Sequence, residues 1–198
     1  MDRPKAGRPH GINTLLAHGG YDPRDYHGFV NPPVVHASTV LFPDAKTMKA
    51  RDQRYTYGTR GTPTTDALCA AVDGLEGSAG TIAVPSGLAA VTVPLLAYLS
   101  AGDHALFVDS IYFPTRRFAN TMLTRLGVEV EYYEPDIGEG IRDRLKPNTR
   151  LIFTESPGSN TFEMQDIPAI TKVACEAGII TMLDNTWATP VFFKPLDH

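Results

Sequence analysis

The stretch at residues 81–99, TIAVPSGLAAVTVPLLAYL, passes from one apolar run into another through Pro85, Ser86 and Gly87. Its first five residues are typical of a short buried strand, and residues 87–99 are long enough and apolar enough for a helix. Ser86 suits the N-cap of that helix, and Gly87 lets another group approach the main chain closely. The stretch therefore predicts a strand, a turn and a helix whose first N–H groups lack partners.

The same alternation of strand and helix patterns continues along the chain. Short apolar runs typical of strands lie at residues 104–109, 128–133, 150–156 and 179–184, and helical patterns lie at 114–126, 140–145 and 167–178. Such alternation implies βαβ crossovers and a mainly parallel sheet that helices cover on both faces. In sheets of this class, ligands bind at the carboxyl ends of the strands.

The chain before this alternating region differs from it in composition and in periodicity. Residues 1–62 are rich in Gly, Pro, His and Tyr with little sustained periodicity, so we expect an extended arm with at most a short helix near residues 45–53. After it, Thr65 suits a helix cap, apolar residues recur at helical spacing, and Gly77 suits the end of the helix. We therefore divide the chain into an arm at residues 1–62 and an α/β domain at residues 63–198.

Composition places the chain among ordinary globular proteins. Of its 198 residues, 42% are hydrophobic and 20% are charged, and the net charge of −4 provides no basic surface for nucleic acid. No apolar run reaches the ~18 residues of a membrane span, and the basic N-terminal segment lacks the apolar core of a signal peptide. Cys69 and Cys175 lack the spacing of a metal or redox motif, so we expect buried, reduced side chains. These features predict a soluble protein of the cytoplasm.

The predicted strands end in polar or aromatic residues that would meet at one edge of the sheet. At Ser86, Gly87 and Leu88, free N–H groups and the positive end of the helix dipole favour an anion such as phosphate, although a plain capped helix would look the same. Asp184 ends an apolar run, so its carboxylate favours a protonated pyridine nitrogen or forms a simple turn. Tyr112 either lays its ring on a planar ligand or packs at the rim.

An aromatic and a cationic residue lie close together in the arm. Tyr57 and Arg60 belong to the segment YTYGTRGTPTT at residues 55–65. An arginine forms strong charge-assisted hydrogen bonds with phosphate, and an arm can reach a neighbouring subunit. The alternative is an exposed arginine that binds no ligand.

Several segments, in consistent order between residues 13 and 198, resemble the Cys/Met-metabolism family of pyridoxal-phosphate (PLP) enzymes. They are YGTRGTPTTDAL at 57–68, VPSGLAAV at 84–91, DSIYFPT at 109–115, TESPGSNTFEMQDIP at 154–168 and LDNTWATPVFFKPLD at 183–197. The resemblance implies an aspartate-aminotransferase-like, fold-type-I α/β architecture, with PLP bound between the subunits of a homodimer or a homotetramer. A nucleotide-binding α/β protein is the poorer alternative, because no glycine fingerprint follows the first predicted strand.

The resemblance also implies roles for individual residues. Gly87 and Leu88 would donate main-chain N–H groups to the cofactor phosphate. Tyr112 would stack on the pyridine ring close to the reacting substrate. Asp184 would keep the ring nitrogen protonated, which makes the cofactor an electron sink.

The family pattern is not matched everywhere. Tyr57 would reach the phosphate of the partner subunit's cofactor, but the family's phosphate-binding arginine lies two residues later, where this chain has Thr59. Either Arg60 substitutes for this arginine, or the positive charge that binds the phosphate is absent from this chain. The family's Schiff-base lysine lies in a Ser-x-Thr-Lys motif beyond the DNTW segment, and Lys194 corresponds to a surface or loop lysine. We therefore expect an incomplete cofactor domain that is inactive alone.

Within the family, the resemblance favours cleavage of L-cystathionine by β-elimination, which yields homocysteine, pyruvate and ammonia in transsulfuration and methionine biosynthesis. The sequence ESPGS at residues 155–159 lies where the γ-synthases, γ-lyases and sulfhydrylases have an Asn-Pro ending, and Trp187 lies where several of them have phenylalanine. Those related activities are the alternatives. A truncated, non-catalytic PLP-binding or assembly fragment is a further one.

Overall fold

The structure is a computed structural model that describes residues 11–198. The first ten residues, which belong to the predicted arm and to the basic N-terminal segment, lie outside the described residues. The chain divides into two compact units, one ending at Ala83 and the other comprising Val84–His198, and each is described by itself. The predicted boundary between an arm at residues 1–62 and an α/β domain at residues 63–198 is a different division, and it stays a prediction.

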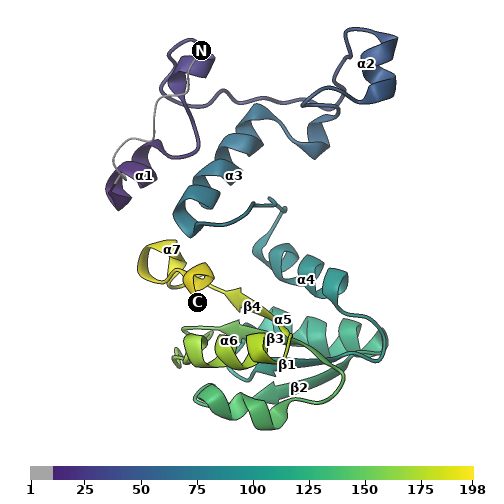
Figure 1. The fold of residues 1–198 in the computed structure, drawn as a ribbon, viewed down its shortest axis with the longest axis vertical. Helices are drawn as coiled ribbons and strands as arrows, with labels where there is room; N and C mark the ends of the chain where they lie inside the picture. Colours follow the sequence, from purple (N-terminus) through teal and green to yellow (C-terminus); the bar gives the residue numbers. More distant parts are fainter. Residues whose placement is uncertain (1–10) are drawn as a thin grey trace. The chain divides into compact units, whose positions relative to one another are not determined.

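The first unit contains more helix than the sequence predicts. The short helix expected near residues 45–53 is α2 (Ala45–Ala50), but α1 (Ile12–His18) and the 3-10 turns η1 (Pro23–Tyr26) and η2 (Gly58–Arg60) also form (Figure 1). The expectation of at most one short helix is therefore wrong. Packing explains α1, because a Cβ added at Gly20 would lie 2.3 Å from the Ala67 carbonyl oxygen, so the end of α1 rests on main chain of the next helix.

The next helix is α3 (Pro63–Glu76), and its N-cap lies three residues before the predicted cap. Thr62 is the N-cap, and Thr65 instead completes a capping box by accepting the Thr62 N–H at 2.8 Å. Pro63 favours this start, since its fixed φ suits the first helical position and its missing N–H costs nothing there. The predicted end is confirmed, because Gly77 adopts the left-handed conformation with φ of 70°.

The second unit is built on a four-stranded parallel sheet in the order β2-β1-β3-β4 (Figure 1). The strands are β1 (His104–Val108), β2 (Glu129–Tyr133), β3 (Thr149–Glu155) and β4 (Ile180–Asp184), each within two residues of its predicted range. The prediction of a parallel α/β sheet is confirmed.

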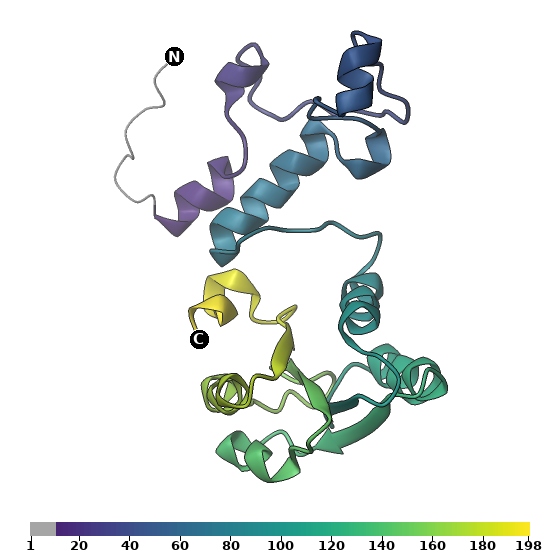
Figure 2. The ribbon, with the colours of Figure 1, turned by 45° about the vertical axis from the view of Figure 1, so that its right-hand side comes forward.

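Helices cover both faces of this sheet. Figure 2 shows α5 (Phe113–Phe118) on one face and α6 (Ile167–Glu176) with the 3-10 helix η4 (Gly138–Arg144) on the other. α4 (Gly87–Tyr98) precedes β1, the π-helical turn η3 (Ala119–Leu123) extends α5, and α7 (Thr189–Phe192) and the 3-10 turn η5 (Pro195–Asp197) follow β4. Within residues 11–198, no helix combines the length and apolar character needed to cross a membrane.

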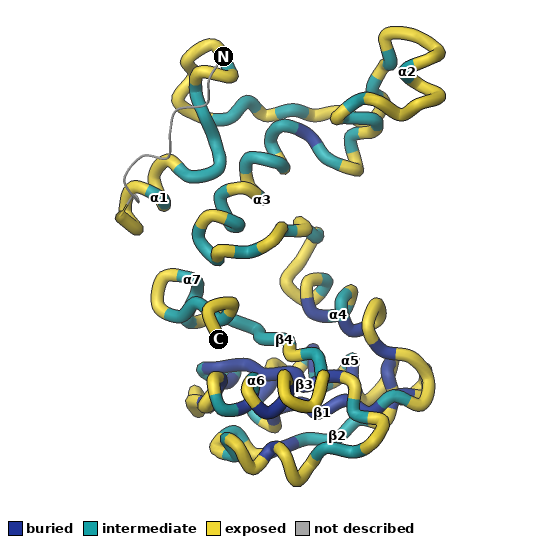
Figure 3. The backbone as a smooth tube through the Cα atoms, viewed as in Figure 1, coloured by how far each residue is buried: buried dark blue, intermediate teal, exposed yellow. Residues whose placement is uncertain are grey.

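The core of the second unit lies around the two central strands. All five residues of β1 and the last five of β3 are buried, whereas the edge strands β2 and β4 are half-buried or exposed over most of their length (Figure 3). From α4 and α6, the side chains that complete this core are Val91, Leu95, Ile170, Val173 and Ala174. The central strands β1 and β3 are thus the most deeply buried strands of the sheet.

The predicted strand at residues 81–85 does not form. The segment is irregular, its Ile82 is 88% exposed, and the described sheet contains no strand paired with it. A strand needs a neighbouring main chain to accept and donate its hydrogen bonds, so an apolar run without such a neighbour stays irregular. The expected helix directly after it does form, as α4.

The cysteines are free, as expected, but they are not buried. Cys69 on α3 is half-buried, and Cys175 near the end of α6 is exposed. Cys175 follows the buried Ala174, so its side chain falls on the outer side of a helix whose inner side packs on the sheet. The expectation of two buried thiols is therefore wrong.

Candidate functional site

The carboxyl edge of the sheet and the start of α4 enclose a cavity of about 560 Å³. The predicted residues Gly87, Leu88, Tyr112 and Asp184 all contribute to its wall. The other lining residues are Ser86, Val91, Glu155, Pro157, Ser159, Thr186 and Trp187. The cavity thus occupies the position where parallel α/β sheets bind ligands.

The first turn of α4 presents unpaired main-chain donors to this cavity. The Ser86 Oγ accepts the Ala89 N–H at 3.1 Å, and the Ser86 carbonyl accepts the Ala90 N–H at 3.0 Å. Among the residues that the structure describes, no acceptor binds the N–H groups of Gly87 and Leu88. A Cβ built on Gly87 meets nothing within 4 Å, so space is open beside these donors. Free N–H groups at the positive end of a helix dipole form a suitable anion site.

Asp184, the last residue of β4, also lines the cavity. Its Oδ1 accepts the Thr186 N–H at 3.0 Å, which orients the carboxylate at the end of the strand. No basic side chain forms an ion pair with it within the described part of the chain. Its second oxygen is therefore available to a donor carried by a ligand.

Tyr112 connects this wall to a residue that the sequence did not single out as a site residue. Tyr112 is 47% exposed, and its main-chain N–H donates to the Glu155 Oε2 at 2.8 Å. Glu155 is the last residue of β3 and only 6% of its surface is exposed. A charged residue that ends an otherwise buried apolar strand is the sequence signal that could have identified it.

Burial raises the pKa of the Glu155 carboxyl to about 7. The Tyr112 N–H opposes this rise because it stabilises the ionised form, and the nearby negative charge of Asp184 adds to it. Glu155 therefore titrates near neutral pH, whereas an ordinary glutamate is ionised there.

The donors and acceptors of the cavity suit the cofactor that the resemblance implies. The free N–H groups of α4 match a phosphate, the Tyr112 ring matches a planar heterocycle, and the Asp184 carboxylate matches a protonated ring nitrogen. Lysine, arginine and histidine are absent from the described lining, so an anionic tail would be held by main chain. Lys194 is not among the described lining residues.

The loop after β3 closes one side of the cavity and depends on a glycine. A Cβ at Gly158 would lie 2.5 Å from the Ser110 Oγ and 2.6 Å from the Ser110 Cβ. The Gly158 N–H donates to the Glu163 carbonyl and the Ser159 N–H to the Ser110 carbonyl, both at 2.9 Å. Only glycine allows this close approach, which positions Pro157 and Ser159 in the cavity wall.

We expect the Gly158→Ala substitution to displace this loop. Forcing a methyl group into such a contact costs about 1–3 kcal/mol, so the free energy of unfolding should fall by that amount. Denaturant unfolding of the protein at its natural length measures the loss, and PLP affinity should fall with it. The matched control is Gly74→Ala in α3, where a Cβ meets nothing within 4 Å and the helix should gain up to about 1 kcal/mol. Unchanged stability in the Gly158 variant would contradict the role of this contact.

Tyr57 and Arg60 lie in the first unit. They line a separate cavity of about 330 Å³ together with Phe42, Met48, Arg51 and Thr56. The Gly58 N–H donates to the Ser38 carbonyl at 2.7 Å, and a Cβ there would lie 1.7 Å from the Ala37 carbonyl oxygen, which fixes this turn. Tyr57 is 45% exposed. A role for these residues toward a cofactor phosphate stays a prediction.

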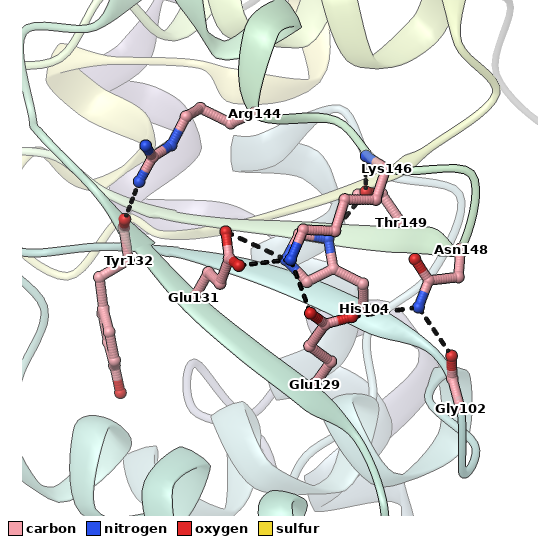
Figure 4. Close-up of polar contacts among 9 residues, drawn as sticks. All are labelled: Gly102, His104, Glu129, Glu131, Tyr132, Arg144, Lys146, Asn148 and Thr149. Atoms are coloured by element: carbon pink, nitrogen blue, oxygen red, sulfur yellow. Dashed lines mark hydrogen bonds and ion pairs between the residues drawn. The ribbon is translucent and has the colours of Figure 1, made fainter.

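The largest polar cluster outside the cavity lies at the amino edge of the sheet (Figure 4). Lys146 forms ion pairs with Glu129 and Glu131, and the buried His104 shares a hydrogen bond of 2.8 Å between its Nδ1 and the Thr149 Oγ1. Burial lowers the pKa of His104, and the positive charge of Lys146 lowers it further. The described residues contain no group of three metal-binding side chains. We interpret the cluster as structural.

The neutral state of His104 leads to a prediction about pH. Because its pKa in the folded protein lies below that in the unfolded chain, the unfolded state binds more protons and stability falls as the pH decreases through the folded-state pKa. We expect the His104→Asn variant, which can retain the bond to Thr149, to lose less stability between about pH 7 and pH 5 than the parent. Urea unfolding at both pH values measures the difference, and equal losses would contradict a neutral buried histidine.

The chain is similar to known proteins over most of its length. A family model described as "Cys/Met metabolism PLP-dependent enzyme" matches residues 13–198. A Rhizobium johnstonii protein named "Putative cystathionine beta-lyase" is 71% identical over 188 residues, which cover 95% of this chain and 48% of the relative. An L-alanine/L-glutamate racemase of Wolbachia pipientis wMel is 42% identical over 201 residues, which cover 93% of this chain and 49% of that protein.

A solved structure also has the same fold as this chain. The crystal structure of metB from Corynebacterium glutamicum matches with a TM-score of 0.89 at 31% sequence identity, covering 96% of this chain and 48% of that one. The chain thus spans about half the length of the proteins that it matches.

Proposed function

Because this chain belongs to the Cys/Met metabolism family of PLP-dependent enzymes, we propose that its protein is a carbon–sulfur lyase that cleaves L-cystathionine to homocysteine, pyruvate and ammonia. The fold is the fold-type-I architecture of its solved relatives, and the cofactor of the family is PLP. One observation carries the proposal: the free N–H groups of α4 and the Asp184 carboxylate line the same cavity. A ligand with a phosphate and a basic ring nitrogen can use both.

We assign four residues of the cavity to the cofactor. Gly87 and Leu88 donate their N–H groups to its phosphate, and the helix dipole of α4 favours the negative charge. Tyr112 packs its ring against the pyridine. Asp184, oriented by the Thr186 N–H, accepts a hydrogen bond from the protonated ring nitrogen. When PLP is bound, it supplies an electron sink for negative charge that develops at the Cα of an amino acid.

Tyr112 also receives a role toward the substrate. Its side chain is about half exposed at the cavity, while the bond from its N–H to Glu155 fixes its main chain. A phenol in this position can hold or pass a proton at the amino group or at the sulfur of a bound amino acid. We therefore assign Tyr112 as a catalytic residue.

We extend the proposal to the assembly. Tyr57 and Arg60 would bind the cofactor phosphate of a partner subunit, which requires a homodimer or a homotetramer. Arg60 is exposed and, among the described residues, forms no ion pair, so its guanidinium is available to an anion. The proposed substrate is a sulfur amino acid of transsulfuration and methionine biosynthesis, and the proposed compartment is the cytoplasm.

A second reaction is favoured by one of the relatives. The 42% identical racemase indicates that a family member can act on the Cα proton of an amino acid without a sulfur leaving group. A γ-synthase, γ-lyase or sulfhydrylase activity, and a non-catalytic PLP-binding fragment, remain the alternatives suggested by the sequence. The 71% identical relative makes the β-lyase the first choice.

The test uses the protein at its natural length, loaded with PLP. We expect L-cystathionine to yield pyruvate, ammonia and a free thiol in equal amounts, and L-alanine to keep its configuration on chiral chromatography. Formation of 2-oxobutyrate and cysteine would instead indicate γ-cleavage. Racemised alanine without pyruvate from L-cystathionine would replace the lyase with the second candidate.

A further inference from the structure

Two carboxyl groups lie side by side at the carboxyl edge of the sheet. Glu155 ends β3, Asp184 ends β4, and the two residues are register partners on adjacent parallel strands. Adjacent strands are about 4.8 Å apart, and register partners project from the same face of a sheet. Both residues line the 560 Å³ cavity. Two acidic groups therefore share one small site.

The surroundings of this pair favour only one negative charge. Among the described residues, no lysine, arginine or histidine lines the cavity. Besides the pair, the titratable side chain of the described lining is the Tyr112 phenol. Arg116, in the helix after β1, forms an ion pair with Asp109 at an N–O distance of 2.5 Å. Within the described lining, no cation therefore offsets a second carboxylate. Two neighbouring carboxylates without a cation favour retention of a proton by one of them.

Glu155 is the member of the pair that retains the proton. It is the more deeply buried of the two, and desolvation penalises its ionised form more strongly. Its Oε2 accepts one hydrogen bond, from the Tyr112 N–H, and among the described residues its Oε1 has no partner. The raised pKa of Glu155 agrees with this assignment.

We propose that Glu155 is a positioning residue that retains a proton to a higher pH than an ordinary glutamate and anchors the main chain of Tyr112 through Oε2. While Glu155 is protonated, Asp184 is the only charged carboxylate of the described cavity lining. The inference about the cofactor rests on the proposed function; the protonation itself does not. Bound PLP brings the positive charge of a protonated ring nitrogen and about two negative charges on its phosphate, so its net charge is negative and favours the protonated form of Glu155 further. Cofactor binding should therefore take up a proton at Glu155.

The first experiment needs no cofactor. Infrared spectra of the ligand-free protein at its natural length are compared at about pH 6 and pH 9, since an ordinary glutamate is ionised at both. We expect a protonated-carboxyl band at the lower pH that disappears at the higher pH and is absent from Glu155→Gln. The matched control is Glu163→Gln, an exposed glutamate of the same loop, which should keep the band. A parent without such a band overturns the proposal, whatever reaction the protein catalyses.

The second experiment tests the coupling to the cofactor. Titration calorimetry of PLP binding in two buffers of different ionisation enthalpy counts the protons taken up near neutral pH. We expect the parent to take up a larger fraction of a proton than Glu155→Gln, and PLP affinity to fall with rising pH less steeply in that variant. Equal proton uptake overturns the coupling. Absence of PLP binding, with the infrared band present, would count against the proposed function and not against a protonated Glu155.

A folding defect is separated from these outcomes by a third variant. Circular dichroism checks each protein, and Glu155→Asp retains a titratable group but is too short to reach the Tyr112 N–H in the same way. It should shift the infrared band and increase the KM for the amino acid more than Glu155→Gln does. A band that is the same in the parent and in the folded Glu155→Asp variant would assign the proton to another residue and overturn the proposal.

Discussion

We expect Asp184→Asn to lower the turnover of the full-length, PLP-loaded protein by about 10²- to 10⁴-fold, because removing one partner of a desolvated ion pair costs about 3–5 kcal/mol and each 1.36 kcal/mol is tenfold in rate. The asparagine keeps an oxygen that can accept the Thr186 N–H, so the end of β4 should stay in place. The substitution removes the negative charge that, on the proposed assignment, holds a proton on the ring nitrogen. Steady-state formation of pyruvate from L-cystathionine measures the effect.

The matched control is Asp109→Asn. Asp109 follows β1 at the same edge of the sheet, but its carboxylate pairs with Arg116 and is not part of the cavity lining. We expect turnover close to that of the parent, because exposed ion pairs contribute only up to about 1 kcal/mol and only to stability. An Asp184→Asn variant that turns over like the Asp109→Asn variant would remove Asp184 from the mechanism.

We expect Gly87→Pro to weaken PLP binding by about 10- to 100-fold, because a hydrogen bond to a charged group contributes about 1.5–3 kcal/mol. Proline removes the N–H that we assign to the phosphate, and the structure accommodates proline otherwise. Gly87 is the first residue of α4, where proline is favoured, and Ser86 has the extended backbone, φ −160° and ψ 159°, that a residue before proline prefers. The absorbance of bound PLP during titration measures the dissociation constant.

The control for this variant is Gly87→Ala. Alanine retains the N–H, and its Cβ meets nothing within 4 Å in the chain. We expect its affinity for PLP to lie between those of the parent and the proline variant, and both variants to keep α4 by circular dichroism. If the proline variant binds PLP as tightly as the parent, the phosphate is held elsewhere.

Local sequence patterns were sufficient to predict most of the strands and helices of the second unit. The four strands and α4, α5 and α6 lie near their predicted ranges because each has an apolar spacing of its own, and Asp166 caps α6 by accepting the Ala169 N–H at 3.0 Å. The residues at the strand ends were found for the same reason, since parallel strands bring their carboxyl ends to one edge. Tyr112 and Asp184 therefore lie at one edge, and the start of α4 adds Gly87 and Leu88 to the same cavity although residues 81–85 form no strand.

Predictions failed where an element depends on a neighbour that is distant in sequence. Residues 81–85 have the pattern of a strand but no strand partner in the described sheet, and α1 has a weak pattern but packs on α3 through Gly20. The cysteines were misjudged because burial depends on which side of a helix meets the sheet. The assignment of Tyr57 and Arg60 to the cofactor remains untested.

By itself, the sequence determined the class of the sheet, the positions of its polar ends and the membership of a PLP-dependent family, since these depend on local spacing and on short segments in order. Only the tertiary structure decided that Glu155 is buried beside Asp184 and bonded to the Tyr112 main chain. The physical reason is that ionisation depends on desolvation and on the distance to neighbouring charges, and both are set by strand register and packing rather than by the residue itself.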